Sequence, residues 1–260
     1  MASRRLDTKT ILLGAAMYAV LLGNVALYAL HPLNPVLHVL IGAVGIHIAF
    51  TVWHEAVHGT VSDQQWGNDV VGVLGMLPYM TPYFMQRWVH LEHHAKLNEP
   101  SDPNSIYTDG AFLTLPFRYF RALGYAKTLL KTDPRTPWQK RSDTATTLFV
   151  VAVFVAAGVT GHIVDALVLW FFPVVVGKLV MDWYINYIPH RGLPPDRHKG
   201  TRIIDVPWFS YLVFNHNYHA VHHMWPTVPW HGYRKLYEKK LDYLKSHDVP
   251  IERRIFGSWT

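Results

Sequence analysis

The sequence predicts an all-α integral membrane protein, with four transmembrane helices in two hairpins and a helical cap on the cytoplasmic side. Half of the 260 residues are hydrophobic and only 16% are charged, well below the roughly 25% of an average soluble domain. Four apolar stretches are expected to span the membrane, and the first has about twenty residues, enough to cross a hydrocarbon core of about 30 Å. Of the 24 Lys and Arg residues, only Lys178 falls inside one of these stretches.

The first two spans are expected at about 11–30 and 36–58, joined by a turn that has two prolines and no basic residue. Arg4, Arg5 and Lys9 precede the first span, which places its start in the cytoplasm. A cleaved signal peptide is the alternative, but its apolar core usually has about 7 to 15 residues. We therefore expect an uncleaved first span.

The second pair is expected at about 144–159 and 163–188, with a turn at Thr160-Gly161-His162. Apart from Lys178, the basic residues precede the first span, lie between the two pairs or follow His190. This pattern predicts that both termini are cytoplasmic, with a cap built from 59–143 and 189–260. The length suits one domain or two small ones, and we expect a single domain over residues 1–260.

Two segments of the cap region are expected to lie near the membrane surface. Val70 to Met85 is apolar but interrupted by glycines and prolines, which fits a segment that dips into the interface or covers a pocket. Leu113 to Lys131 mixes apolar and basic residues, so it is expected to form a helix on the membrane surface or an ordinary amphipathic helix that covers the cap.

Composition excludes several classes of site. The chain has no Cys, which excludes disulfides, cysteine-ligated zinc, iron–sulfur clusters and thiolate haem. Any metal must therefore be held by nitrogen and oxygen ligands. The net charge of +6 is better explained by anionic lipid than by nucleic acid, because the basic residues lie beside apolar spans.

Histidines in three tight clusters are the main functional signal. Eight of the 17 histidines lie in these clusters, which are His54-x-x-x-His58, His90-x-x-His93-His94 and His219-x-x-His222-His223. Residues three and four apart share one face of a helix, so each cluster directs its imidazoles into one small volume. Given the predicted topology, all three clusters lie on the cytoplasmic side, and the pattern is typical of a metal site.

Eight imidazoles exceed what one first-row metal ion accepts, so we expect two ions, and we favour iron because it activates dioxygen. His190 and Asn186, at the cytoplasmic end of the last span, are further candidates. His190 is either a ligand or a structural residue, and Asn186 either binds a metal-held water or caps the helix. Glu55, Glu92 and Asp182 either hold the N–H groups of ligands or are solvated.

These clusters, in this order and between paired spans, resemble the three histidine boxes of membrane fatty acid desaturases and related hydroxylases. The resemblance covers about Val52 to Tyr233. It implies a di-iron centre, four transmembrane helices, a cytoplasmic catalytic cap and oxidation of a long apolar chain by dioxygen, with the eight box histidines in the catalytic site. Members of this family have a further metal-binding His before the third box and in some cases an Asn one turn earlier, which His190 and Asn186 match.

Within the superfamily, the sequence from His90 to Pro103 and that from Asn217 to Trp230 resemble the second and third boxes of carotenoid ring hydroxylases. The resemblance implies hydroxylation of a carotenoid ring. Acyl-lipid desaturases share much of the pattern and are the alternative, followed by carotenoid ketolases. A histidine-rich metal transporter is the non-enzymatic alternative, but its ligands would lie near the middle of the bilayer.

Electrons for the reaction are expected to come from another protein, because the chain has no haem-attachment or dinucleotide-binding motif. The expected partners are a lipid substrate and a ferredoxin or cytochrome with its reductase, and no nucleic acid. The choice between an alcohol and an alkene as product depends on how the substrate is placed, which spacing does not reveal.

Overall fold

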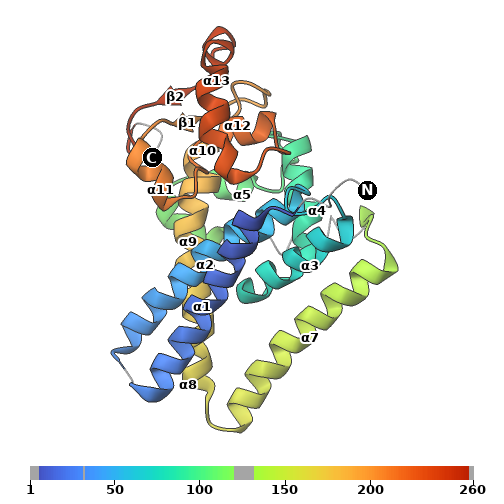
Figure 1. Ribbon diagram of the computed structural model, residues 1–260, viewed down its shortest axis with the longest axis vertical. Coiled ribbons are helices and arrows are strands. Elements are labelled where there is room, and N and C mark those ends of the chain that lie inside the picture. Colours follow the sequence, from blue (N-terminus) through green and yellow to red (C-terminus); the bar gives the residue numbers. More distant parts are fainter. Residues whose placement is uncertain (1–5, 32, 120–131, 258–260) are drawn as a thin grey trace. The chain divides into compact units, whose positions relative to one another are not determined.

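The computed structural model describes residues 6–31, 33–119 and 132–257, and these are mostly helical (Figure 1). The chain divides into two compact units, which we describe separately. The first unit comprises Met1–Arg87 and Arg135–Met181, and the second comprises Trp88–Pro134 and Asp182–Thr260. Among the described residues, four helices are long and apolar enough to cross a membrane, in agreement with the predicted number.

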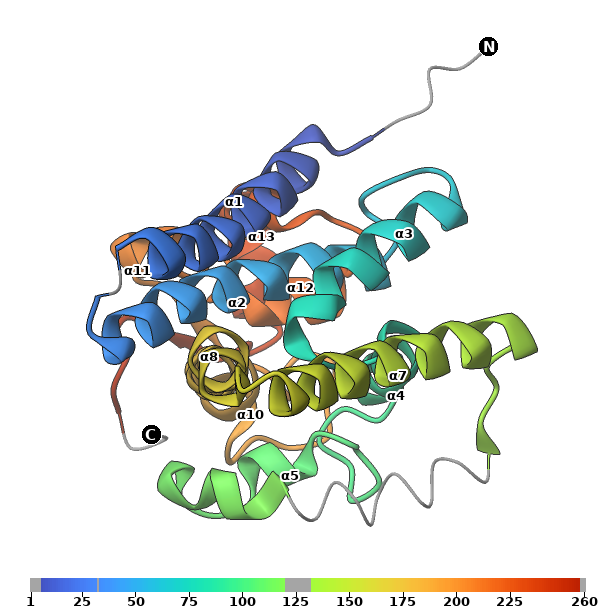
Figure 2. The ribbon, with the colours of Figure 1, turned by 90° about the horizontal axis from the view of Figure 1, so that it is seen from below.

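The first unit is built around helix α2 (Pro35–Val57). In its most apolar stretch 61% of the residues are buried, compared with 17% in α1 (Thr8–Leu30). Helix α2 packs against α1 on one side and against α9 (Phe172–Met181) on the other (Figure 2). Gly42 and Gly45 allow these contacts, because a Cβ atom there would lie 2.7 Å from Pro173 Cγ and 2.5 Å from Leu21 Cδ2.

The segment after α2 forms α3 (Gln65–Met76) and the 3₁₀ turn η1 (Leu77–Tyr79), followed by α4 (Tyr83–Ala95). Helix α3 packs on α2 so closely that a Cβ on Gly75 would meet the backbone nitrogen of Trp53 at 2.9 Å. The glycines expected to interrupt an interfacial segment therefore serve helix packing. Of the predicted surface helix, residues 115–119 are helical, whereas 120–131 lie outside the described residues.

Helix α7 (Pro137–Val159) begins at Pro137 rather than near residue 144 as predicted. Thr136 and Gln139 form a capping box, and Pro137 occupies the first helical position, so the helix starts in a polar stretch. Buried Asp143 then accepts hydrogen bonds from the backbone nitrogens of Phe84 (3.0 Å) and Met85 (2.8 Å) at the start of α4. The polar start of α7 thus anchors α4, which carries the second histidine cluster.

The last apolar helix runs from Ile163 to His190 and is not a regular α-helix throughout. Helix α8 (Ile163–Ala166) is followed by a π-helical turn, η4 (Leu167–Phe171), then by α9. A second π-helical turn, η5 (Asp182–Tyr187), precedes the short α10 (Ile188–His190). Pro189 has no N–H to donate within the helix, and π-helical turns often mark functional sites.

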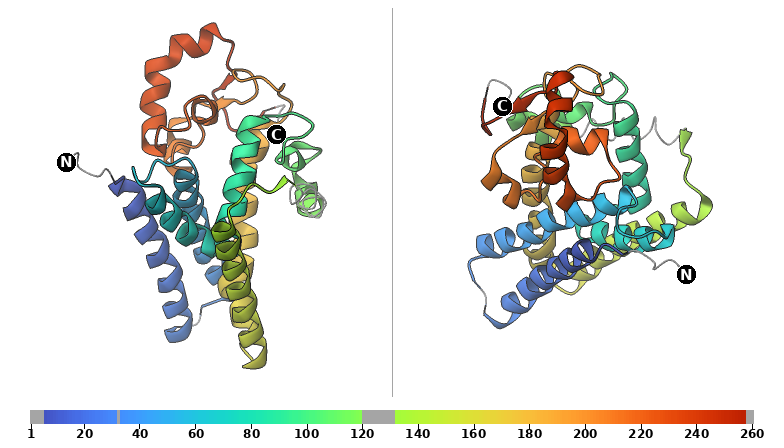
Figure 3. Two further views of the ribbon diagram at one scale, coloured as in Figure 1. Left: turned by 90° about the vertical axis from the view of Figure 1, so that its right-hand side faces the viewer. Right: turned by 45° about the horizontal axis from the view of Figure 1, so that its top comes forward.

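The second unit consists of short elements around a compact core. In addition to the end of α4, η5 and α10, it contains α5 (Ser105–Thr108), η2 (Phe112–Thr114), β1 (Ile203–Ile204), α11 (Pro207–Leu212), α12 (His219–Met224), η6 (Trp230–Gly232), α13 (Tyr233–Ser246) and β2 (Ile251–Glu252). Strands β1 and β2 pair in parallel, with Ile203 opposite Ile251. Helix α12 packs against α13 (Figure 3).

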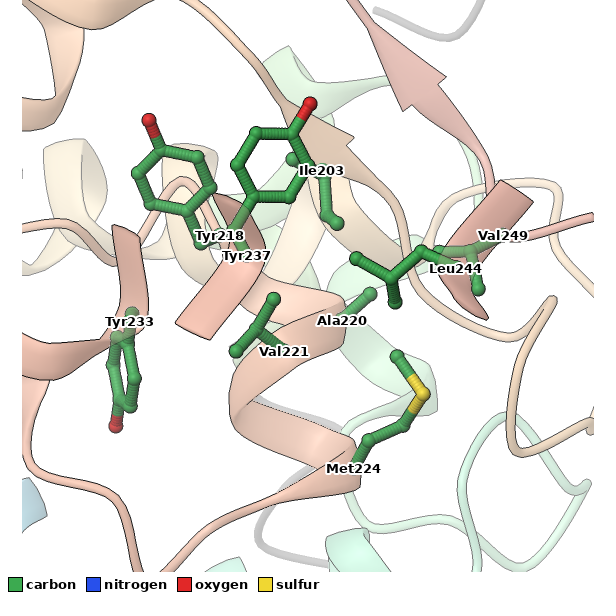
Figure 4. Packing of buried hydrophobic residues seen from close by; sticks show 9 residues of the cluster. All are labelled: Ile203, Tyr218, Ala220, Val221, Met224, Tyr233, Tyr237, Leu244 and Val249. Atoms are coloured by element: carbon green, nitrogen blue, oxygen red, sulfur yellow. The ribbon is translucent and has the colours of Figure 1, made fainter. Parts of the chain in front are cut away.

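The core of the second unit orients α12. Ala220, Val221 and Met224 of this helix pack with Tyr237 and Leu244 of α13 (Figure 4). His219, His222 and His223 lie three and four residues apart on the same short helix. When the apolar residues pack on α13, the imidazoles are therefore directed to other faces of α12. The adjoining β1 is fixed to the same segment, because Asn217 Nδ2 donates to the carbonyl of Ile204 at 2.7 Å.

Candidate metal centre

The first histidine cluster lies at the end of α2 in the first unit. His54 is in the last turn of the helix and His58 is its C-terminal cap, and the two ring centroids are 4.9 Å apart. Desolvation by the surrounding protein, together with the positive charge of Arg87, lowers the pKa of His58 to about 3. His58 is therefore a neutral imidazole near pH 7, which is the form that binds metals.

The second unit contains the other two clusters and His190. From α4 and α12 it brings His90, His94 and His222 into one group. The Nε2 atom of His94 lies 3.1 Å from that of His90 and 3.0 Å from that of His222. Nitrogens at such separations fit around one first-row metal ion, because two nitrogens that each bind the same ion at about 2.1 Å lie at similar distances from each other.

A second group in the same unit draws on three elements. It contains His93 of α4, His190 of α10, and His219 and His223 of α12, whose candidate ligand nitrogens all lie within 4.8 Å of one another. The Nε2 of His219 is 2.8 Å from that of His190 and 3.1 Å from that of His223. His190 thus belongs to the cluster geometrically, as its sequence position suggested.

Hydrogen bonds on the far sides of two rings determine which nitrogens face the centre of this group. His93 Nδ1 lies 2.9 Å from one oxygen of Asp102 and 3.0 Å from the other, so it donates its proton to the carboxylate. His190 Nδ1 lies 3.3 Å from Asn98 Oδ1, and the amide nitrogen of Asn98 is engaged by backbone carbonyls, including that of Gly200 at 2.6 Å. Both Nε2 atoms therefore present lone pairs to the centre.

The surroundings of the group favour the neutral form of His223. Burial lowers the pKa of His223 well below its ordinary value, and the neighbouring His94 and His219 add to this effect. Several neutral imidazoles with nitrogens about 3 Å apart repel one another through their lone pairs, and a bound cation removes that repulsion. The donor set, with nitrogen only and no thiolate, suits iron, zinc or copper better than magnesium or calcium.

Asn186 is held in a buried polar network beside His190. Its Nδ2 donates to Asp182 Oδ1 at 2.8 Å, and its Oδ1 accepts a hydrogen bond from Asn104 at 3.1 Å. The hydroxyl of Tyr119 donates to the other oxygen of Asp182. These bonds fix the position of the Asn186 side chain.

The three carboxylates proposed to hold ligand N–H groups differ in their contacts. Glu92 forms an ion pair with Lys96 at 2.6 Å, and the two side chains are 29% and 38% exposed, which fits the solvated alternative. Buried Glu55 lies 3.6 Å from His54 Nδ1 and accepts a hydrogen bond from Thr60 at 2.6 Å. Asp182 holds Asn186.

Sequence reasoning missed Asp102, Asn98 and Tyr233 as partners of the histidines. Tyr233 is the first residue of α13, and its hydroxyl lies 2.9 Å from His222 Nδ1. Asp102 follows His93 by one short loop, in which Asn98 adopts a φ of 56° and turns the chain back. An Asn in a loop just after a histidine-rich helix is compatible with such a turn but does not reveal the contact.

The sequence pattern of fatty acid desaturases matches residues 30–254. The chain belongs to the fatty acid desaturase family. This membership and the four long apolar helices indicate an integral membrane protein of the desaturase and hydroxylase superfamily. Its histidine clusters are compatible with a metal site.

Three relatives illustrate the range of this similarity. The chain is 25% identical over 220 residues to the sn-1 oleoyl-lipid 12-desaturase of a Picosynechococcus species, covering 72% of this chain and 63% of that protein. It is 28% identical over 191 residues to the beta-carotene ketolase of a Paracoccus species, covering 70% of each. A shorter match, 30% over 93 residues, covers 33% of this chain and 26% of the sn-1 acyl-lipid omega-3 desaturase (ferredoxin) of a Nostoc species. The chain spans about half to two thirds of the length of the first desaturases that it matches.

Proposed function

We propose that the protein is an O₂-dependent di-iron membrane oxidoreductase that hydroxylates a ring of a carotenoid. The observation that carries the proposal is the convergence of His93, His190, His219 and His223, whose ligand nitrogens lie within 4.8 Å of one another. Two of these rings present lone pairs to the same point because Asp102 and Asn98 accept their Nδ1 protons. Such a set suits a redox-active transition metal.

The proposed ligands fall into two sets. One iron would be held by His93, His190, His219 and His223, and Asn186 is a proposed member of this site. The other would be held by His90, His94 and His222 of the second unit, whose Nε2 atoms lie close together. With His54 and His58 of the first box, which the resemblance to the family also implies as ligands, the proposal counts nine histidines, which suits two ions better than one.

Bound iron supplies the reduction of dioxygen and the removal of hydrogen from an unactivated C–H bond. The chain's own residues hold and orient the site. Asp102 fixes the ring of His93, and Tyr233 fixes that of His222. Buried α4 and α12 residues also keep bulk water away from the histidines, as His93 and His222 are 2% and 0% exposed. The outcome, an alcohol or an alkene, depends on which substrate carbon is held at the site.

The lengths of the matched regions support a carotenoid substrate. The match to the beta-carotene ketolase covers 70% of both chains, whereas the desaturase match covers 72% of this chain but only 63% of the relative. The protein thus agrees better in extent with a relative whose name specifies beta-carotene. An acyl-lipid desaturase is the second candidate, because several relatives carry that name.

The proposed topology has two transmembrane hairpins, a cytoplasmic cap and cytoplasmic termini. It is supported by the four apolar helices and by the basic residues, which avoid the turns after α1 and α7. We further propose that a ferredoxin or cytochrome donates the electrons. One relative's name specifies ferredoxin, and no dinucleotide-binding motif occurs in this chain.

Expression in a host that makes β-carotene tests the proposal. Hydroxylated carotenoid in the pigment extract is the expected product, and new double bonds in the fatty acids would support the second candidate instead. The His222→Ala variant should lose activity while remaining in the membrane, because only one proposed ligand is removed. Full turnover by this variant would refute the ligand assignment.

A further inference from the structure

A polar pocket of about 280 Å³ opens beside the candidate metal centre, within the second unit. It lies between the loop that follows α4 and the loop that follows α10. Its walls include Glu99, Asp102, Asn104, Ser105 and Asp109. Glu99 and Asp109 are exposed, whereas Asp102 is buried, so carboxylates lie both at the surface and in the interior of this pocket.

Two buried imidazoles also line this pocket. They belong to His93 and His190, which are 2% and 3% exposed over the whole residue. Both are members of the group of four whose ligand nitrogens converge. The pocket therefore joins exposed carboxylates to two of the proposed ligands of one iron.

A buried metal site needs a path by which the ion reaches it. Water occupies about 30 Å³ per molecule, so 280 Å³ accommodates a divalent ion that still carries a shell of roughly six waters. Carboxylates attract such a hydrated cation, and imidazoles are preferred ligands once a first-row transition metal loses its water. The order of groups in this pocket, from carboxylate to imidazole, follows that sequence of events.

The pocket wall is held rigidly. Asn98 Nδ2 donates to the backbone carbonyls of Gly200 at 2.6 Å and Pro194 at 3.1 Å, which ties the loop after α4 to the loop after α10. Asp102 accepts hydrogen bonds from the backbone nitrogens of Asn98 at 2.8 Å and Asn104 at 2.7 Å. These bonds fix the positions of the two loops that form the pocket walls.

We propose that this pocket is a loading vestibule, through which a hydrated divalent iron ion passes from Glu99 and Asp109 to His93 and His190. The inference rests on the proposed function, in which these histidines hold iron. It assigns to the exposed carboxylates a role in the rate of metal uptake and not in the final affinity.

A removable plug tests the vestibule. Because the chain has no Cys, Ser105→Cys introduces a single thiol in the pocket wall, and a bulky methanethiosulfonate reagent can attach there as a mixed disulfide. Full-length protein is stripped of metal in detergent and mixed with Fe²⁺ without oxygen, and bound iron is measured over time after rapid desalting. Ser246→Cys, on exposed α13, carries the same label as the matched control.

The labelled Ser105→Cys protein should take up iron at least about tenfold more slowly than the labelled Ser246→Cys protein, but reach the same final iron content. Reductive removal of the label, followed by removal of the reductant, should restore the rate. Equal uptake rates for the two labelled proteins would overturn the vestibule. Absence of iron binding by the unmodified protein would instead overturn the proposed function, so the two failures are distinguishable.

Charge variants provide a second test that needs no label. Glu99→Gln combined with Asp109→Asn should slow uptake by roughly three- to tenfold at low salt, and the difference should shrink at high salt because ions screen the attraction. Asp242→Asn, on exposed α13, is the control and should leave the rate unchanged. An uptake rate of the double variant equal to that of the control at low salt would contradict the role of these carboxylates.

Discussion

Replacement of Asp102 by Asn tests how the protein orients His93. In the native protein the carboxylate accepts hydrogen bonds from His93 Nδ1 at 2.9 Å and from the backbone nitrogens of Asn98 at 2.8 Å and Asn104 at 2.7 Å. An asparagine offers one acceptor oxygen, and its NH₂ group cannot accept, so at least one of these three donors loses its partner. The His93 ring then loses either its orientation or the tautomer that directs a lone pair at the metal.

We expect this change to weaken metal binding by about 10- to 100-fold, which corresponds to about 1.4 to 2.8 kcal/mol. The free energy of unfolding should fall by a further 1 to 3 kcal/mol, roughly, because a buried donor is left unsatisfied. The assay is a titration of metal-free protein with Co²⁺ against a competing chelator, together with denaturation of the same samples.

Glu92→Gln is the matched control, because Glu92 lies on the same helix as His93 but pairs with Lys96 at the surface. It should change the metal affinity by less than about twofold, as expected for an exposed ion pair. If Asp102→Asn bound Co²⁺ as tightly as Glu92→Gln does, the contact between Asp102 and His93 would not contribute to metal binding, and the reasoning would be refuted.

Three further changes probe other contacts. Tyr233→Phe removes the hydroxyl 2.9 Å from His222 Nδ1 and should weaken metal binding about tenfold with little effect on unfolding; unchanged affinity in the same titration would contradict this role. Gly72→Ala places a Cβ 2.2 Å from the ring of Tyr83 and should lower the free energy of unfolding by about 1 to 3 kcal/mol. Gly23→Ala is the control, because a Cβ there has nothing within 4 Å, and it should stabilise α1 slightly. Equal thermal stability of the two variants would argue against close packing at Gly72. Asp143→Ala removes the carboxylate that lies 2.5 Å from Arg135 and should lower the free energy of unfolding by about 3 kcal/mol or more. A melting temperature equal to that of the unmodified protein would show that the contact of Asp143 with α4 does not contribute to stability.

Much of the helical architecture could be predicted from the sequence, because hydropathy and length are local properties. The four apolar helices follow directly from them. Helix α7 begins at Pro137, before the apolar span expected from residue 144, because its first turns are polar and are capped by Thr136 and Gln139. The π-helical turns η4 and η5 were not predicted, since they depend on how the last helix packs as well as on its composition.

Parts of the candidate site could be read from spacing, and others could not. The helical period correctly brings His90 and His94 together, and it also places Glu92 on another face, where it pairs with Lys96. The contact between His190 and His219 joins segments that are distant in sequence, so spacing alone left it open. Asp102 reaches His93 only through the turn at Asn98, whose positive φ is a property of the folded loop.

Metal analysis combined with oxygen uptake tests the central claim most directly. Protein purified from cells supplied with iron should contain about two iron atoms per chain, bound mainly by nitrogen, and should consume dioxygen when reduced in the presence of a carotenoid. Zinc without iron, together with no oxygen consumption under reducing conditions, would contradict the assignment as a di-iron oxidoreductase.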